Sequence, residues 1–99
     1  MLRVATHREA AAETIAAALY YDRQVPRLGA DFLVRYDSLV ATIRTRPRLF
    51  RAVRRGVRKA RLSRFPYAIY FELLADRIHL LAVAHQHRRP LYWLERRAD

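Results

Sequence analysis

The 99-residue sequence contains no cysteine, which excludes disulfide frameworks, thiolate metal sites and cysteine nucleophiles together. It contains only two glycines, Gly29 and Gly56, and these are too few for either common type of phosphate-binding glycine loop. No apolar run approaches the ~18–20 residues that span a bilayer, and the charged residues of the first nine positions leave no hydrophobic segment of a signal peptide. We therefore expect a cytoplasmic protein.

Acidic residues are also scarce. Nine aspartates and glutamates oppose 20 lysines and arginines, and the formal net charge is +11. The segment 44–64 contains ten basic residues and no acidic one, whereas ordinary surfaces intersperse the two signs. It therefore predicts a focused positive field that attracts phosphates or an acidic protein segment. The alternative is an arginine-rich composition with a solvated face. The residues of this segment that we expect to bind a target or nucleic acid are Arg54, Arg55, Arg58 and Arg64.

Two helices are predicted in the first half of the chain. Thr6 and Glu9 match the pattern of a capping box, in which each side chain is expected to bond the backbone of the other residue. An alanine-rich helix then runs to about Asp22, and Pro26 interrupts its pattern. The second helix continues until Pro47, because one apolar stripe is formed by Leu28, Phe32, Tyr36, Leu39, Val40 and Ile43. The short connection favours an antiparallel helical hairpin.

The remaining pattern is that of β-strands. Strands are expected at residues 1–5, 57–64, 67–74 and 78–84, with a loop over 47–56. The last strand is apolar on both faces and therefore central. In the strand 57–64, Ala60 and Leu62 share one face, and Lys59 and Arg61 share the other. The sequence predicts one α+β domain over residues 1–99, with an N-terminal strand and a helical hairpin packed on an antiparallel sheet in the order β-α-α-β-β-β.

Enzyme signatures that depend on a metal or a catalytic dyad are missing. His85 and His87 lie two residues apart, but a metal ion would need further ligands. No paired carboxylates suggest glycosidase-type acid–base chemistry, and the only serines, Ser38 and Ser63, have no triad context. We therefore expect no metal and no cofactor.

The chain closes on a cationic and aromatic cluster, residues 85–93, directly after the predicted central strand. Its side chains should emerge at one edge of the sheet, facing Lys59, Arg61 and Arg64. Such a group can cleave RNA without a metal, because arginines neutralise the phosphate while a histidine or tyrosine moves the proton of the 2′-hydroxyl. Aromatic rings in a basic groove also suit single-stranded RNA. Packing is the alternative for the aromatic residues, and the cluster members that we expect to bind a target are Arg89 and Trp93.

Several groups of residues occur together in a characteristic order. They are Glu13 with Ala16 to Tyr21, Pro26 to Gly29 with Phe32, Ile43 with Pro47 and Phe50, Arg64 to Tyr70, Ala82 to His85, and Arg88 to Pro90 with Trp93. In this order and spacing the chain resembles the RelE/ParE superfamily, the toxins of bacterial type II toxin–antitoxin modules, which include many plasmid stabilisation proteins. The resemblance covers nearly the whole chain. It implies a fold of a strand, a helical hairpin and antiparallel strands, in agreement with the periodicity.

The resemblance implies one of two activities. The RelE-like branch cleaves ribosome-bound messenger RNA, and the residues at matching places are Lys59, Arg61, Arg88 and Tyr92, with His85 as an added catalytic candidate. The ParE-like branch lacks a catalytic set and poisons DNA gyrase. The closing pattern of a histidine, two arginines, a proline and a tryptophan is closer to this branch, although the acidic residue common between the arginines and the proline is missing.

Both branches imply an acidic antitoxin whose C-terminal segment wraps the toxin, in a toxin–antitoxin hetero-oligomer. The charge of +11 supplies the physical reason for such a partner, which we expect to dock on the helical stripe and the basic sheet. The leading hypothesis is a toxin that inhibits DNA gyrase. The alternatives are a metal-independent, ribosome-dependent endoribonuclease and a non-toxic basic module that binds nucleic acid.

Overall fold

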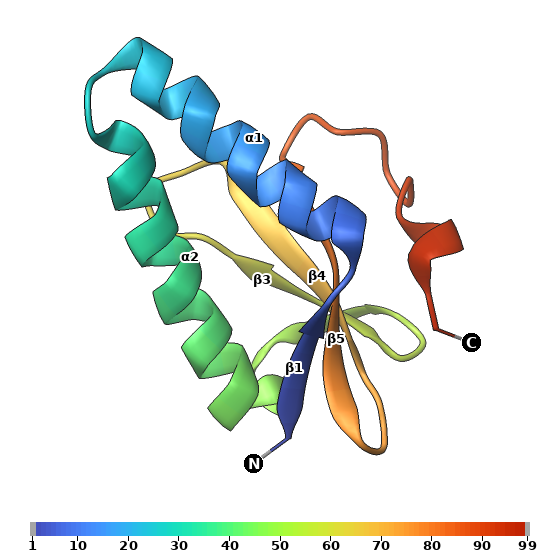
Figure 1. Cartoon of the computed structure of the whole chain (residues 1–99). Helices are drawn as coiled ribbons and strands as arrows, with labels where there is room; N and C mark the ends of the chain where they lie inside the picture. The colour runs from blue at the N-terminus through green and yellow to red at the C-terminus, as the bar shows by residue number, and fades with distance from the viewer. Residues whose placement is uncertain (1, 99) are drawn as a thin grey trace.

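The computed structural model describes residues 2–98. The elements in chain order are β1 (Arg3–Thr6), α1 (Arg8–Gln24), α2 (Leu28–Thr45), a short 3-10 helix (Pro47–Leu49), β2 (Arg51–Arg54), β3 (Val57–Arg61), β4 (Tyr67–Leu73), β5 (Arg77–His85) and a second 3-10 helix (Leu94–Arg96). Figure 1 shows the two helices packed along the sheet, with the C-terminal segment on the other side of the sheet from α2. The predicted α+β class and the helical hairpin are confirmed.

The sheet has the strand order β1-β5-β4-β3-β2. All neighbouring strands are antiparallel except β1, which runs parallel to β5 with Arg3 opposite Arg77. The sheet is therefore mixed. The helical hairpin follows β1 directly, and it separates β1 from the four strands that pair antiparallel with one another. Strand β2 was not expected within 47–56. It is an edge strand with little buried side-chain area, so it lacks the apolar alternation that reveals a strand.

Helix α1 does not begin with the predicted capping box. Thr6 is the last residue of β1 and pairs with Leu80, so its backbone is committed to the sheet. His7 is the N-cap instead, and its Nδ1 accepts a hydrogen bond from the backbone N–H of Glu9 at 3.1 Å. The capping box was wrong because strand pairing extended through the residue that would have capped the helix.

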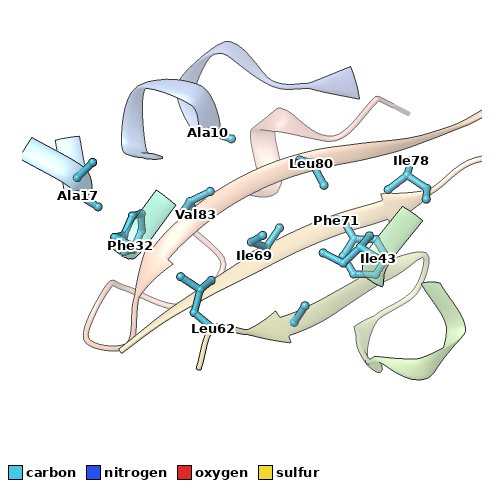
Figure 2. Close-up of a cluster of buried hydrophobic side chains, with 12 residues drawn as sticks. Ala10, Ala17, Phe32, Ile43, Leu62, Ile69, Phe71, Ile78, Leu80 and Val83 are labelled. Carbon is cyan, nitrogen blue, oxygen red and sulfur yellow. The ribbon is translucent and has the colours of Figure 1, made fainter. Parts of the chain in front are cut away.

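The main core lies between the helices and the sheet (Figure 2). Phe32 and Ile43 of α2 are fully buried and pack with Ile69 and Leu80 of the sheet. Much of the apolar stripe of α2 is therefore occupied within the molecule, and the docking of a partner on the helical hairpin stays a prediction. The alanines of α1 let the helices approach closely, and a Cβ at Gly29 would collide with a backbone oxygen of that helix.

A second, smaller core lies on the opposite face of the sheet. The C-terminal segment folds back over this face and seats Trp93, which is 1% exposed, against Val57, Leu81 and Ala82. The indole stacks on the ring of Tyr70 with a centroid distance of 5.2 Å. The segment after β5 is therefore part of the folded domain. No helix in residues 2–98 has the length and apolar character needed to cross a membrane.

Candidate anion-binding site

An open pocket of about 180 Å³ lies where β3, β4 and β5 meet the loop after β5. It contains every residue that was proposed as catalytic, and these are Lys59, Arg61, His85, Arg88 and Tyr92. Arg89 and Trp93 also line it, and no acidic residue of the described chain does. The structure thus brings four permanent cations and a histidine around one cavity, which makes it a candidate site for an anion.

The two cations of β3 reach the pocket because of strand alternation. Ala60 and Leu62 are buried in the core under the helices, so Lys59 and Arg61 project from the opposite face, as predicted. The Nζ of Lys59 lies 5.7 Å from the centroid of the Tyr70 ring. Since Tyr70 stacks on Trp93, the second core positions this ammonium group at the pocket wall.

The loop after β5 supplies the opposite wall. The backbone N–H of Arg88 donates to the carbonyl of His85 at 2.9 Å, and Gln86 donates to the carbonyl of Pro66 at 2.8 Å. The guanidinium carbon of Arg88 lies 4.0 Å from the centroid of the Tyr92 ring. A guanidinium stacked on a ring keeps its N–H edge free for a phosphate or a carboxylate, so Arg88 is arranged to bind an anion.

The hydroxyl of Tyr92 is hydrogen-bonded within the protein, and this contact affects its acidity. Its hydroxyl donates a hydrogen bond to Oε2 of Glu13 at 2.8 Å. Burial, followed by the hydrogen bond to Glu13 and its negative charge, raises the pKa of the Tyr92 phenol well above its ordinary value of 10.0. The phenol is therefore neutral at physiological pH, and its proton is held by Glu13 on the α1 side of the ring.

Glu13 joins α1 to the C-terminal segment. Its Oε1 accepts from the backbone N–H of Val83 at 2.9 Å and from Nη1 of Arg96 at 2.9 Å. The same Nη1 donates to the carbonyl of Leu81 at 3.1 Å, which is the extra residue of a β-bulge in β5. Beyond the end of β1, Glu13 and Arg96 thus provide hydrogen-bond partners for backbone groups of β5. Apart from the family resemblance, the only feature of the sequence that marks Glu13 is its place as a carboxylate in an alanine-rich segment.

His85 lies at the end of β5, with its ring edge-on to Tyr67 at a centroid distance of 5.3 Å. Its Nδ1 accepts from the backbone N–H of His87 at 3.1 Å. This hydrogen bond assigns the proton of the neutral imidazole to Nε2. His85 in this form is a hydrogen-bond donor toward a ligand through Nε2.

The other expected binding arginines lie outside the pocket. Arg54 and Arg55 lie at the β2–β3 turn, at the opposite end of β3 from Arg61. Arg58 donates to the carbonyl of Phe50 at 2.6 Å, which ties β3 to the segment before β2. Arg64 adopts a left-handed backbone with φ of 70° and lines a separate groove beside α2. Of the basic residues of 44–64, only Lys59 and Arg61 therefore line the pocket.

A second ionisable cluster, which sequence reasoning missed, lies at the far end of the sheet. Glu72 is 1% exposed, and its Oε2 lies 2.9 Å from Nδ1 of His79 and accepts from the backbone N–H of Ala98 at 3.0 Å. Its Oε1 accepts from Nε of Arg97 at 3.3 Å. These bonds satisfy the buried carboxylate and fasten the end of the C-terminal segment. No group of three or more metal-ligand side chains occurs in the described residues.

Comparison with known proteins extends these observations. No family model matches the sequence, and no curated protein matches it either. Among solved structures, the chain is similar to one described as "Chromosomal ParDE TA system from P. aeruginosa", with a TM-score of 0.76 and 20% sequence identity. The match covers 86% of this chain and 96% of the other. This likeness confirms the fold that the RelE/ParE resemblance implied.

Proposed function

We propose that the protein is the toxin of a type II toxin–antitoxin module and that an acidic antitoxin neutralises it. The observation that carries this proposal is the pocket on a ParDE-like fold, with Lys59, Arg61, Arg88 and Arg89 around it and no carboxylate in its described lining. Clustered cations without counter-charges repel one another and are stabilised by an anionic partner. The charge of +11 extends the same attraction over the whole chain.

Within this proposal, we favour an inhibitor of DNA gyrase. An RNA-cleaving site needs a group that takes the proton of the ribose 2′-hydroxyl. The Tyr92 phenol is unsuited to that task, because its hydroxyl already donates to Glu13 and its pKa is raised. A gyrase inhibitor needs no such group. In this function the cationic pocket binds the target and catalyses no reaction.

The second candidate is a metal-independent, ribosome-dependent endoribonuclease. It is favoured by one observation, the convergence of the five candidate residues on one pocket. In this reaction Lys59, Arg61 and Arg88 stabilise the charge that develops on the phosphate. The Nε2–H of His85 donates its proton to the leaving 5′-oxygen, and a water molecule accepts the proton of the 2′-hydroxyl as that oxygen attacks the phosphate. Tyr92 then positions Arg88 through its ring.

Controlled expression in growing bacteria tests the proposal. The chain alone should arrest growth, and co-expression of the small acidic protein encoded beside it should relieve the arrest and yield a co-purifying complex. Gyrase inhibition predicts double-strand breaks and a DNA-damage response with transcripts intact. Transcript cleavage that requires ribosomes and is lost in His85→Ala would establish the endoribonuclease instead. Normal growth of cells that contain the soluble, folded chain would contradict the toxin proposal. It would favour the non-toxic basic module that binds nucleic acid.

A further inference from the structure

The edge strand β2 and the short 3-10 helix before it form a strongly basic part of the surface. Five arginines in and beside these elements are exposed, and no acidic residue occurs in the sequence between Asp37 and Glu72. We call this surface the basic edge, and its residues are Arg46, Arg48, Arg51, Arg54 and Arg55. Since none of them lines the anion-binding pocket, the proposed function leaves the basic edge unexplained.

The five guanidinium groups of the basic edge have no partner within residues 2–98. None of them takes part in an ion pair or in a side-chain hydrogen bond. Arg58 of β3, by contrast, donates to the carbonyl of Phe50 at 2.6 Å. Unpaired like charges repel one another, and a polyanion removes this repulsion. The basic edge is therefore suited to a ligand that carries several negative charges.

The geometry of β2 disfavours an acidic peptide that would add a strand to the sheet. β2 is the last strand of the sheet, and an outer strand offers its free backbone groups for pairing. The register of β2 shifts between Ala52 and Arg54. Such a β-bulge interrupts the regular row of hydrogen-bonding groups that an added strand needs, and charged side chains on the strand oppose pairing as well. The basic edge therefore fits a polyanion better than a peptide strand.

The basic edge also lacks a platform for unstacked bases. Phe50 is the only aromatic residue of the segment 44–64, and it packs edge-on against Phe71 with a centroid distance of 6.0 Å. Single-stranded nucleic acids gain affinity by stacking their bases on aromatic rings, whereas a duplex is bound through its phosphates. The chain from Arg46 to Arg55 spans at most about 30 Å, which is within one helical turn of B-DNA. The five arginines can therefore contact phosphates on one side of a duplex.

We infer that the basic edge binds the phosphate backbone of double-stranded DNA without reading its sequence. Arginine holds a phosphate through paired N–H groups, and each contact releases a counter-ion from the DNA. The inference goes beyond the proposed function, since it uses a surface outside the pocket. The choice of DNA over duplex RNA rests on the proposed function, because gyrase acts on duplex DNA and a chain bound there is concentrated beside its target.

Fluorescence anisotropy of the full chain tests the inference. The probe is a fluorescein-labelled DNA duplex of about two helical turns, titrated at salt concentrations from about 50 to about 200 mM. The comparison ligands are one strand of this duplex, an RNA duplex of the same sequence, and poly-glutamate. The test variant removes three charges of the basic edge and combines Arg46→Gln, Arg48→Gln and Arg54→Gln.

The matched control variant removes the same charge from exposed residues of the helical hairpin. It combines Arg8→Gln, Arg23→Gln and Arg27→Gln. A third variant, Arg61→Gln with Arg88→Gln, removes two cations of the pocket. Circular dichroism checks that each variant is folded.

The wild type should bind the DNA duplex with a dissociation constant of about 1–100 μM. A plot of the logarithm of the binding constant against that of the salt concentration should have a slope of about −4 to −5, since each of five phosphate contacts contributes about −0.9. The test variant should reduce the magnitude of this slope by about 2–3 and weaken binding at least about tenfold. The control and pocket variants should each change the slope by less than about 1.

Four results would each overturn the inference: no binding of the DNA duplex, equal effects of the test and control variants, tighter binding of the single strand or of poly-glutamate, or an RNA duplex that binds as tightly as the DNA. Growth arrest is measured separately. If the chain arrests growth but does not bind the duplex, the basic edge is wrong and the toxin function stands. Duplex binding that depends on the basic edge, in a chain that does not arrest growth, would support the inference and contradict the toxin function.

Discussion

Glu13 and Arg96 are 83 residues apart in sequence and meet in a bidentate ion pair, with Nη1–Oε1 at 2.9 Å and Nη2–Oε2 at 3.1 Å. Only 16% of the Glu13 side chain and 9% of the Arg96 side chain are exposed. A pair this well buried is costly to break, because removing one member leaves the other charge buried and unpaired. The contact is therefore one of three that hold the C-terminal segment on the sheet, with the burial of Trp93 and the hydrogen bonds of Glu72.

Glu13→Ala should lower the free energy of unfolding by about 2–4 kcal/mol, since Arg96 loses its nearer carboxylate and keeps only Glu9 at 3.8 Å, and the N–H of Val83 loses its acceptor. Urea unfolding followed by circular dichroism measures this change. Glu95→Ala is the control, because Glu95 is an exposed neighbour of Arg96 and should change stability by less than about 0.5 kcal/mol. Equal effects of the two substitutions would show that the ion pair contributes nothing specific.

Trp93→Ala should destabilise the protein by about 3–5 kcal/mol, as expected for truncation of a large, fully buried aromatic side chain. Because Trp93 is the only tryptophan, its fluorescence reports docking of the segment in the wild type, and the variant is followed by circular dichroism. Leu94→Ala provides the comparison, since Leu94 is 37% exposed and should cost about 1 kcal/mol or less. A mild effect of Trp93→Ala would contradict the role of the second core.

The raised pKa of Tyr92 predicts how stability depends on pH. The folded protein keeps the phenol proton to a higher pH than the unfolded chain does, so its contribution is complete below pH 10 and is lost as the pH rises further. The free energy of unfolding should fall above pH 10 more steeply in the wild type than in Tyr92→Phe, by up to about 1 kcal/mol per pH unit.

Tyr20→Phe, which removes the hydroxyl of a tyrosine that is 49% exposed, should keep the wild-type slope. Parallel curves for the wild type and Tyr92→Phe would show that Glu13 does not hold the phenol proton.

The position of the arginines, more than their number, should determine target binding. Arg61→Gln combined with Arg88→Gln removes two cations of the pocket and should abolish growth arrest and reduce the salt dependence of target binding. Arg54→Gln combined with Arg55→Gln removes the same charge at the opposite end of β3 and should leave both nearly unchanged. Both double variants should lose less than about 1 kcal/mol of stability. Equal loss of toxicity in the two pairs would mean that net charge alone acts.

Periodicity predicted the elements that bury an apolar face. The stripe through Phe32 and Ile43 identified α2, and the alternation around Ala60 identified the face that carries Lys59 and Arg61. Strand β2 was not predicted, because a strand at the edge of a sheet requires no apolar side chains. The cap at His7 was misplaced because a local motif at Thr6 competed with pairing to Leu80, which lies far along the chain.

The candidate site was predicted as a set of residues, but the contacts that govern its chemistry were not. Lys59, Arg61, His85, Arg88 and Tyr92 do share a pocket. That Tyr92 donates its proton to Glu13 could not be read from either residue's neighbours, since the contact depends on how the loop after β5 crosses the sheet. Such long-range polar contacts leave no periodic signal in a sequence.

The parallel pairing of β1 with β5 has a consequence for the order of folding. Arg3 faces Arg77, so β1 cannot pair until β5, which follows both helices and three other strands, has been synthesised. The helical hairpin and the β3–β4 pair can form from local contacts, whereas the pairing of β1 closes a long loop and is slow for that reason. The ion pair between Glu13 and Arg96 forms later still, because Arg96 follows β5 in the sequence. A nascent chain therefore lacks the completed pocket until the segment that follows β5 has been synthesised and has folded back onto the sheet.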